Sequence, residues 1–150
     1  MDVIAKNKKA FYEYFINDTL EAGIALNGDE VKSLREGKVS INEAFAETDN
    51  GELWLINANI SSYKNSSKIL ISDEKRKRKL LVKKKDINTF QGKVEREGYT
   101  IVPIKIYFNK KGIAKVEIAV AKGKKLHDKR EDKKQKDWNK HKQRLLRKFK

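Results

Sequence analysis

Apolar residues recur at every second position in several short stretches, and this period constrains the fold more than any other feature of the chain. Between Tyr14 and Leu26 the period of two is broken only at Asp18. Alternation of this kind is typical of a β-strand with one buried face, and the break predicts a bulge or a bend. The same alternation covers residues 113–120. We therefore expect a chain that is mainly β.

Turn residues join the expected strands in pairs. Asn50-Gly51 separates two apolar runs, and this dipeptide is a strong hairpin signal because both residues tolerate positive φ. A second hairpin is expected around residues 109–112. Pro103 lies within the run that precedes this turn and indicates an edge position or a bulge. Besides residues 14–26, the expected strands cover residues 43–48, 52–60, 78–82, 99–108 and 113–120.

Two segments between the strands predict short helices. We expect the first over residues 29–36, capped by Asn27 or Asp29 and ended by Gly37. In the second, Asp86 is the expected cap and Gly98 the expected stop. The residues that would share one face of this second helix are Ile87, Phe90 and Val94.

Short antiparallel strands in this number usually close into a barrel or pack as a sandwich. For 150 residues we expect one domain with an appendage, and we favour an oligonucleotide-binding type of barrel. The chain contains no cysteine, which excludes disulfides and thiolate metal sites and fits a reducing compartment. The sequence shows no signal-peptide run and no stretch of transmembrane length, so we expect a cytoplasmic protein with no membrane partner.

Positive charge is concentrated near the C-terminus. The chain holds 36 Lys and Arg against 21 Asp and Glu, and residues 121–150 hold 14 of those cations with only 4 acids. Such an excess predicts attraction to polyanions, nucleic acid first and anionic membrane second. A single run of charge can equally be a solvated surface, but an excess of one sign in one segment argues against that interpretation.

The C-terminal segment differs in kind from the rest. No strand pattern continues from Ala121 onward, and the apolar residues are too sparse to fold alone. We expect a barrel domain over residues 1–122 and a basic tail over residues 123–150, disordered in isolation and helical on an anionic partner. A plain basic arm is the alternative. Trp138 and Leu145-Leu146 argue against it, because a purely electrostatic arm has no use for apolar residues.

Two further surfaces have the composition of an RNA contact. Lys75–Lys79 and Lys83–Lys85 form the densest basic cluster outside the tail. Arg76 and Arg78 share a face if this run is extended, and arginine can fork onto phosphate or stack on bases. The second surface combines cations and rings, which suits unpaired bases, although for its Tyr14 we favour core packing. Its residues are Asn7, Lys8, Lys9, Phe11, Tyr12 and Tyr14.

Catalytic motifs are not evident. The sequence has no nucleophile elbow, phosphate-binding glycine loop or dinucleotide fingerprint. His127 and His141 lie fourteen residues apart without an acidic ligand pattern, so we expect no metal site. The acidic pairs Asp29-Glu30 and Asp73-Glu74 would permit a Mg²⁺-dependent nuclease, but adjacent acids are more often surface or capping residues. We expect neither enzyme activity nor a cofactor.

Taken together, the motifs resemble the small protein B (SsrA-binding protein) family, which partners transfer-messenger RNA in bacterial ribosome rescue. The most specific stretches are EAGIALNGDEVKSLREGK at 21–38 and AKGKKLHDKR at 121–130. The matching stretches follow one another in order over essentially the whole chain. They cover residues 7–41, 55–63, 76–81, 98–108 and 116–131, followed by Trp138 and Leu145-Leu146.

The resemblance implies a closed, antiparallel, six-stranded oligonucleotide-binding barrel with about three short helices. It also implies that the barrel binds the tRNA-like part of transfer-messenger RNA, and that the tail enters the empty mRNA path near the decoding centre of a stalled ribosome. We expect the free protein to be a monomer. By position in the family motifs, the expected RNA-binding residues are Asn7, Lys8, Glu30, Lys32, Arg35, Lys38, Asn57, Arg76, Arg78, Lys79, Lys124 and Lys125. The expected ribosome-binding residues are Gly123, His127, Asp128, Lys129, Arg130, Trp138, Leu145 and Leu146.

The loop over residues 60–78 departs from the family pattern. Ser62, Ser72, Glu74 and Lys77 stand where His or Pro is common. Which side chains of this loop touch RNA is therefore open. Three functions are compared: a partner of transfer-messenger RNA, a general binder of ribosomal or single-stranded RNA, and a metal-dependent nuclease.

Overall fold

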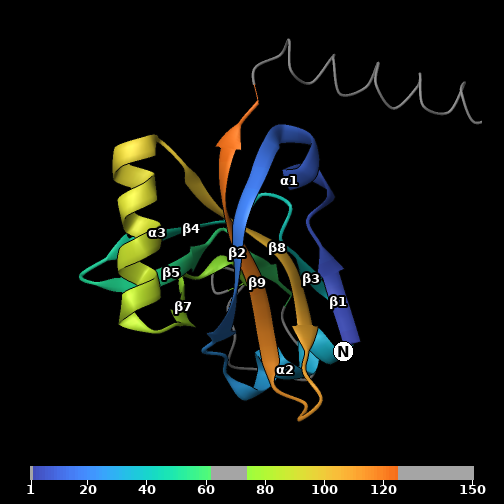
Figure 1. The fold of residues 1–150 in the computed structure, drawn as a ribbon. Helices are drawn as coiled ribbons and strands as arrows, with labels where there is room; N and C mark the ends of the chain where they lie inside the picture. The colour runs from blue at the N-terminus through green and yellow to red at the C-terminus, as the bar shows by residue number, and fades with distance from the viewer. Residues whose placement is uncertain (1, 62–73, 125–150) are drawn as a thin grey trace, which may run out of the picture.

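Six antiparallel strands pair one after another in a ring, and three helices lie around it (Figure 1). The computed structural model describes residues 2–61 and 74–124. The elements are β1 (Asp2–Lys6), α1 (Lys8–Glu13), β2 (Tyr14–Ile24), α2 (Gly28–Arg35), β3 (Val39–Ser40), β4 (Phe45–Asp49), β5 (Glu52–Ile56), β6 (Asn59–Ile60), β7 (Arg78–Leu81), α3 (Lys84–Glu97), β8 (Thr100–Phe108) and β9 (Ala114–Gly123). The ring runs β8-β4-β5-β7-β2-β9 and returns to β8, while β1 adds to β8 and β3 pairs with β6.

The two predicted hairpins are confirmed. β4 and β5 pair around Asn50 and Gly51, whose φ values are 52° and 75°. β8 and β9 pair along most of their length, with Gly112 in the turn at φ 75°. The strand expected over residues 52–60 is wrong in extent. β5 ends at Ile56 because Asn57 adopts a φ of 63°, and β6 leaves the ring to pair with β3.

β2 carries the bulge that the break at Asp18 predicts. Its register against β9 shifts between Ile16 and Thr19, and the two strands are paired on both sides of this shift. β9 extends further than the sequence pattern indicates. Tyr14–Ile16 pair with Ala121–Gly123, so the expectation that no strand continues beyond Ala121 is wrong. The partner strand supplies backbone hydrogen bonds that side-chain alternation does not encode.

The helices α2 and α3 form close to where the sequence predicts them. Asn27, rather than Asp29, caps α2, in a capping box completed by Glu30. α3 begins after Lys83 with no side-chain cap, so the prediction that Asp86 caps it is wrong. Asp86 instead lies in the first turn, where a carboxylate favours the positive end of the helix dipole. Gly98 ends α3 at φ 72°, as expected.

The N-terminal elements β1 and α1 and the short β3 were not anticipated from the sequence. β1 pairs with residues 105–108 of β8, whereas β4 pairs with β8 at Ile101. Pro103 lies in β8, where the register against β9 shifts between Pro103 and Lys105, so the bulge alternative holds. The resemblance to the small protein B family implied about three helices, and residues 2–61 and 74–124 contain three.

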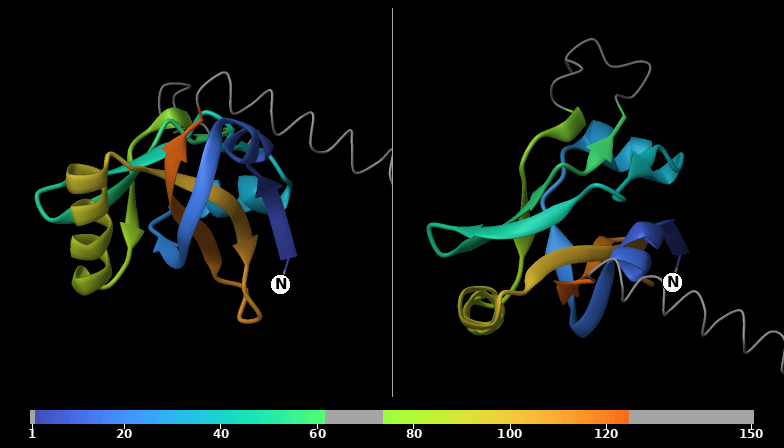
Figure 2. Two further views of the ribbon diagram at one scale, coloured as in Figure 1. Left: turned by 45° about the horizontal axis from the view of Figure 1, so that its top comes forward. Right: turned by 90° about the horizontal axis from the view of Figure 1, so that it is seen from above.

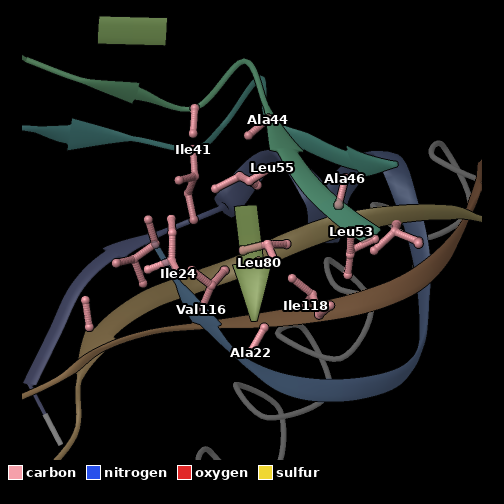
Figure 3. Close-up of a cluster of buried hydrophobic side chains, with 14 of the residues drawn as sticks. Ala22, Ile24, Ile41, Ala44, Ala46, Leu53, Leu55, Leu80, Val116 and Ile118 are labelled. Carbon is pink, nitrogen blue, oxygen red and sulfur yellow. The ribbon is translucent and has the colours of Figure 1, made fainter. Parts of the chain in front are cut away.

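The core fills the interior of the ring. Ala22, Leu53, Leu80 and Ile118 come from β2, β5, β7 and β9 and point toward one another (Figure 3). Leu34 of α2 belongs to the same cluster, as do residues of α3. A smaller cluster of Ala10, Val102 and Ala121 seats α1 against β8 and β9, and Tyr14 packs on it. The preference for packing over RNA contact at Tyr14 agrees with this placement.

The tail predictions beyond Lys124 and those for residues 62–73 lie outside the described residues. The expected helicity of the tail and its boundary with the domain therefore stay predictions.

Gly92 within α3 and Gly98 directly after it give a matched test of this fold. At Gly98 a Cβ would be forced into the left-handed region, so Gly98→Ala should lower the free energy of unfolding by about 1 kcal/mol. Gly92 lies inside the helix with open space around an added Cβ, so Gly92→Ala should raise it by about 0.5–1 kcal/mol. Urea unfolding followed by circular dichroism measures both. Effects of the same sign would contradict the helix end at Gly98.

Candidate nucleic-acid interface

β7 is the strand on which the candidate interface is built. Its side chains alternate, so that Arg78 and Leu80 are buried while Lys79 is half-buried and Leu81 is 53% exposed. The inward side chains fix the strand in the ring, because Leu80 packs in the core. The outward ones present a cation and an apolar surface to solvent. The strand therefore couples a buried electrostatic cluster to an exposed basic surface.

The buried cluster consists of Glu30 and two arginines. Arg78 is 0% exposed, and its Nε donates to Glu30 Oε2 at 2.6 Å. Arg76 forks onto the same carboxylate, with its Nε 3.2 Å from Oε2 and its Nη2 donating to Oε1. Glu30 Oε1 also accepts from the backbone N–H of Asn27 at 3.0 Å, which completes the cap of α2. One carboxylate therefore ties the start of α2 to β7.

Arg78 also holds the two segments on either side of residues 62–73. Its Nη1 donates to the carbonyl of Ala58 at 2.9 Å, and its Nη2 donates to the carbonyl of Glu74 at 2.9 Å. A buried guanidinium needs several acceptors, and these carbonyls supply them together with Glu30. The side chain therefore ties Ala58 to Glu74 across the interval of residues 62–73.

The arginines outweigh burial in setting the ionisation of Glu30. Burial raises the pKa of the Glu30 carboxyl, but hydrogen bonds from Arg76 and from the backbone of Asn27 lower it, as does the charge of Arg78. The net result is a pKa below the ordinary value of 4.5. Glu30 is thus a carboxylate at neutral pH, and the cluster keeps a net positive charge.

Two cations of this region, Lys77 and Lys79, pair with carboxylates at the surface. Lys77 Nζ lies 3.1 Å from Asp49 Oδ2 and 5.0 Å from the centre of the Trp54 ring. Lys79 Nζ lies 2.9 Å from Glu52 Oε1. Exposed ion pairs contribute about 0–1 kcal/mol and are screened by salt. A phosphate can therefore replace either carboxylate at little cost.

A groove of about 660 Å³ runs along the outer side of β7. It lies between the β4–β5 turn and the start of α3, which flank the ring on one side in two views (Figure 2). The cations at its wall come from β7 and from the first residues of α3. The lining residues are Asn50, Gly51, Glu52, Lys79, Leu80, Leu81, Val82, Lys83, Lys84 and Ile87.

α2 adds a second line of cations near the buried cluster. Lys32 and Arg35 are exposed on this helix, whereas Glu30 on the same helix is buried. Lys38 follows the helix and pairs with Glu36 at 2.9 Å. The helix therefore buries its carboxylate and presents its cations, which makes this surface more positive than the sequence alone indicates.

Three expected RNA-binding residues use their side chains in hydrogen bonds to other parts of the protein. Asn7 is 2% exposed, caps α1 through the N–H of Ala10 and donates to the carbonyl of Pro103 at 2.8 Å. Asn57 donates to the carbonyl of Glu43 at 3.1 Å. Arg78 is fully buried, as described above. Their contact with RNA stays a prediction, and the structure gives each of them a role in positioning the backbone.

The structure brings some expected residues together and separates others. Glu30, Arg76 and Arg78 form one cluster. Lys79 follows Arg78 in β7 and therefore lies beside this cluster. Lys8 and Lys124 lie away from this cluster: Lys8 is the first residue of α1, and Lys124 contacts the carbonyl of Phe11 in the same helix. Gly123 is the last residue of β9. The other expected residues, which are Lys125, His127, Asp128, Lys129, Arg130, Trp138, Leu145 and Leu146, lie outside the described part of the chain.

Leu81 and the groove beside it were missed by the sequence interpretation. Leu81 lies in the continuous apolar run Leu80-Leu81-Val82, whose pattern does not show which of the three side chains is buried. Only the pairing of β7 with both β5 and β2 shows that this side chain points outward. Within residues 2–61 and 74–124, no cluster of three acidic or histidine side chains could hold a metal ion. Over the same residues, no helix is long and apolar enough to cross a membrane.

Comparison with known proteins gives one consistent result. The family model described as "SmpB protein" matches residues 4–148. An "SsrA-binding protein" of Nitrobacter hamburgensis is 56% identical over 145 residues, which cover 97% of this chain and 92% of the relative. A protein of the same name from a Bradyrhizobium species is also 56% identical with the same coverage. A solved structure described as "tmRNA-SmpB: a journey to the center of the bacterial ribosome" is 47% identical, with a TM-score of 0.70, and the match covers 87% of this chain and 94% of that chain.

The buried cluster predicts a large effect of one substitution. Glu30→Gln leaves the buried Arg78 without a counter-charge, so the free energy of unfolding should fall by about 3 kcal/mol. The control Glu36→Gln removes an exposed pair with Lys38 and should cost less than about 0.5 kcal/mol. Urea unfolding at neutral pH compares them. Equal stability of the two variants would contradict the role given to Glu30.

The lowered pKa of Glu30 makes this contribution depend on pH. Because the folded protein holds this carboxyl ionised below its ordinary pKa of 4.5, the stabilisation is complete above that value and is lost as the pH falls through the lower folded pKa. The stability difference between the native protein and Glu30→Gln should therefore be full at neutral pH and shrink toward about pH 3. Urea unfolding at both pH values measures it, and a constant difference would rule out this linkage.

Proposed function

Because the chain belongs to the SmpB protein family, we propose that it binds the tRNA-like domain of transfer-messenger RNA and brings it to stalled ribosomes for trans-translation. The observation that carries this proposal is the 47% identity to the chain in the tmRNA-SmpB structure over 87% of the present chain. The role is one of binding, and the ribosome carries out the peptide transfer. The ring of six strands would then be an oligonucleotide-binding type of barrel.

The surface around β7 supports a contact with folded RNA. Its cations come from three elements and stand in several rows, which suits the phosphates of a shaped RNA better than a single extended strand. Lys79, Lys83 and Lys84 face the groove, and Lys32 and Arg35 lie on α2. In this arrangement Glu30 and Arg78, which are buried, position the cations around them. Arg76, which is about one-third exposed, would meet the RNA directly.

The tail supplies the second half of the proposal. We place residues 123–150 in the empty mRNA path of a stalled ribosome, near the decoding centre. Support comes from the concentration of charge there and from the family motif at residues 121–130. His127 can stack on a base and hydrogen-bond to phosphate, and the apolar residues Trp138 and Leu145-Leu146 would seat the segment.

Identification of the bound RNA tests the first half. We expect one abundant RNA with a tRNA-like end to co-purify with the full-length protein from cell extract, even in the presence of competitor RNA. Sequencing of the bound RNA measures this. A spread of ribosomal RNA fragments would instead support a general RNA binder, and Mg²⁺-dependent cleavage of the bound RNA would support a nuclease.

Salt dependence tests the basic surface. RNA affinity should fall roughly 100-fold between about 50 and 200 mM salt, since several phosphate contacts release counterions. Lys79→Gln with Lys83→Gln should reduce the slope of log affinity against log salt by about 2. Lys110→Gln with Lys111→Gln, in the exposed turn between β8 and β9, is the control and should leave the slope nearly unchanged. Filter binding measures the slopes, and equal slopes for both variants would exclude the groove as the contact surface.

Truncation separates the two halves. A chain that ends before Asp128 should keep nearly all of its affinity for transfer-messenger RNA, because the surface around β7 is intact. The same chain should fail to support peptide tagging on stalled ribosomes in a reconstituted translation reaction. Full-length protein is the control. Equal loss of RNA affinity and of tagging would show that the two parts do not act separately.

A further inference from the structure

The ring of strands is least complete where β4 meets β8. β4 pairs with β5 along its whole length, but in the described part of the chain it pairs with β8 only where Ala46 is opposite Ile101. The connection that precedes β8 explains this. Gly98 ends α3 in the left-handed region, and β8 begins at Thr100, so no residue of β8 lies opposite the second half of β4.

This part of β4 leaves an open backbone edge at Thr48. The turn between β4 and β5 has two residues, so Asp49 and Glu52 on either side of it form a hydrogen-bonded pair. Backbone groups along a strand point alternately to its two sides, so those of Thr48 point away from β5. The backbone of Ala46 points the same way and meets β8, whereas the described residues supply no strand partner to Thr48. An open strand edge can pair with another extended chain.

A groove of about 340 Å³ lies beside this edge, between β4 and α3. Figure 2 shows α3 and the β4–β5 hairpin on the same side of the ring. Three large apolar side chains line the groove: Phe45, which is 37% exposed, and the half-buried Val94 and Tyr99. Volumes of about 300–1,000 Å³ are typical of sites that enclose a ligand. The groove therefore has room for an apolar side chain of a segment that lies along Thr48.

The charge of the groove is opposite to that of the chain as a whole. The chain has 36 Lys and Arg against 21 Asp and Glu, yet the described residues that line the groove include Glu47 and no cation. Glu47 is exposed and has no ion-pair partner within residues 2–61 and 74–124. Gln91 Nε2, also in the lining, donates to Glu95 Oε1 at 3.0 Å, which places a second exposed carboxylate at the rim. This charge repels a phosphate and attracts a cationic side chain.

The adjoining hollow shows how a lysine fits beside these carboxylates. Lys9 Nζ lies 2.7 Å from Glu43 Oε1 and 3.8 Å from Glu13 Oε1. Both carboxylates border a hollow of about 130 Å³, which shares Phe45 with the groove. Glu43 and Glu47 are both exposed, two residues to either side of Phe45, and Lys9 pairs with the first of them. A cation supplied by a partner would give Glu47 the contact that Lys9 gives Glu43.

We propose that the groove between β4 and α3 binds an extended segment of a partner protein that is rich in lysine or arginine. The segment hydrogen-bonds to the backbone of Thr48 as a short added strand, packs an apolar side chain against Phe45 and pairs a cation with Glu47. The proposed function places the basic tail of this chain in the mRNA path, so the segment comes from another protein. The interaction is distinct from RNA binding and does not depend on which RNA the chain carries.

Short peptides of defined charge test the groove. Full-length protein is titrated at about 150 mM salt with a dye-labelled heptapeptide in which lysine alternates with valine, and fluorescence anisotropy gives the affinity. One comparison peptide alternates lysine with serine, which keeps the charge, and the other alternates glutamate with valine, which reverses it. We expect the lysine–valine peptide to bind roughly 10-fold more tightly than either, because it alone supplies both the cation and the buried apolar side chain. Equal affinity for the two lysine peptides would overturn the proposal.

Two pairs of variants locate the contact. Glu47→Lys should weaken binding of the lysine–valine peptide roughly 10-fold, whereas Glu36→Lys, which reverses a carboxylate at the end of α2, should have little effect. Phe45→Ala should also weaken it roughly 10-fold, whereas Ile113→Ala removes an exposed apolar residue from the β8–β9 turn and should leave it unchanged. Circular dichroism verifies that each variant is folded. The groove is excluded as the binding site if the two members of either pair bind alike.

Amide exchange in the native protein tests the strand pairing without any substitution. With the lysine–valine peptide bound, the backbone N–H of Thr48 should exchange roughly 10-fold more slowly in nuclear magnetic resonance spectra, while that of Lys110 in the β8–β9 turn should not change. Unchanged exchange at Thr48 would overturn the proposal.

Two further outcomes identify other occupants of the groove, and either would overturn the proposal. Protection of the Thr48 amide by hexa-uridylate RNA in place of the peptide would show that the groove takes nucleic acid. In the full-length chain, Trp138→Ser with Leu146→Ser should leave the affinity for the lysine–valine peptide unchanged. A roughly 10-fold gain in affinity would show that the tail of this chain occupies the groove.

Discussion

A single buried guanidinium, that of Arg78, ties together parts of the chain that are far apart in sequence. It binds the carboxylate of Glu30 at the start of α2 and the carbonyls of Ala58 and Glu74 on both sides of residues 62–73. Burying an arginine is costly unless every donor finds an acceptor, so the cluster persists only as a complete set. The orientation of α2, the positions of Ala58 and Glu74, and the position of Lys79 on β7 all depend on it.

The ring gives this cluster a rigid frame. Leu80, two residues after Arg78, packs among Ala22, Leu53 and Ile118 in the core, so β7 cannot shift its register without exposing Leu80 and burying Lys79. Such an exchange is strongly unfavourable. The outward side of the strand therefore presents Lys79 at a fixed position. A basic surface with fixed spacing can select a folded RNA by shape, whereas a flexible basic segment attracts any polyanion.

The two ends of the molecule carry different chemistry. Around β7 and α2 the exposed surface is mostly charged, and its lysines are held by exposed carboxylates that a phosphate can displace. Around α1 the exposed surface is aromatic, with Lys122 and Lys124 beside Phe15. The first composition suits phosphates arranged on a folded RNA, and the second suits bases that are not paired.

The sequence by itself determined the β class, both hairpins, the bulge near Asp18 and the basic character of the chain. These features depend on local rules: side-chain alternation, the φ tolerance of Asn50-Gly51 and the count of charges. Tertiary structure alone decided that Arg78, in a basic run, is buried while Leu81, in an apolar run, is exposed. Arg78 and Glu30 are 48 residues apart, and no local pattern records which distant carboxylate will meet a given cation. Burial is a property of neighbours brought together by the ring, and only the folded chain supplies those neighbours.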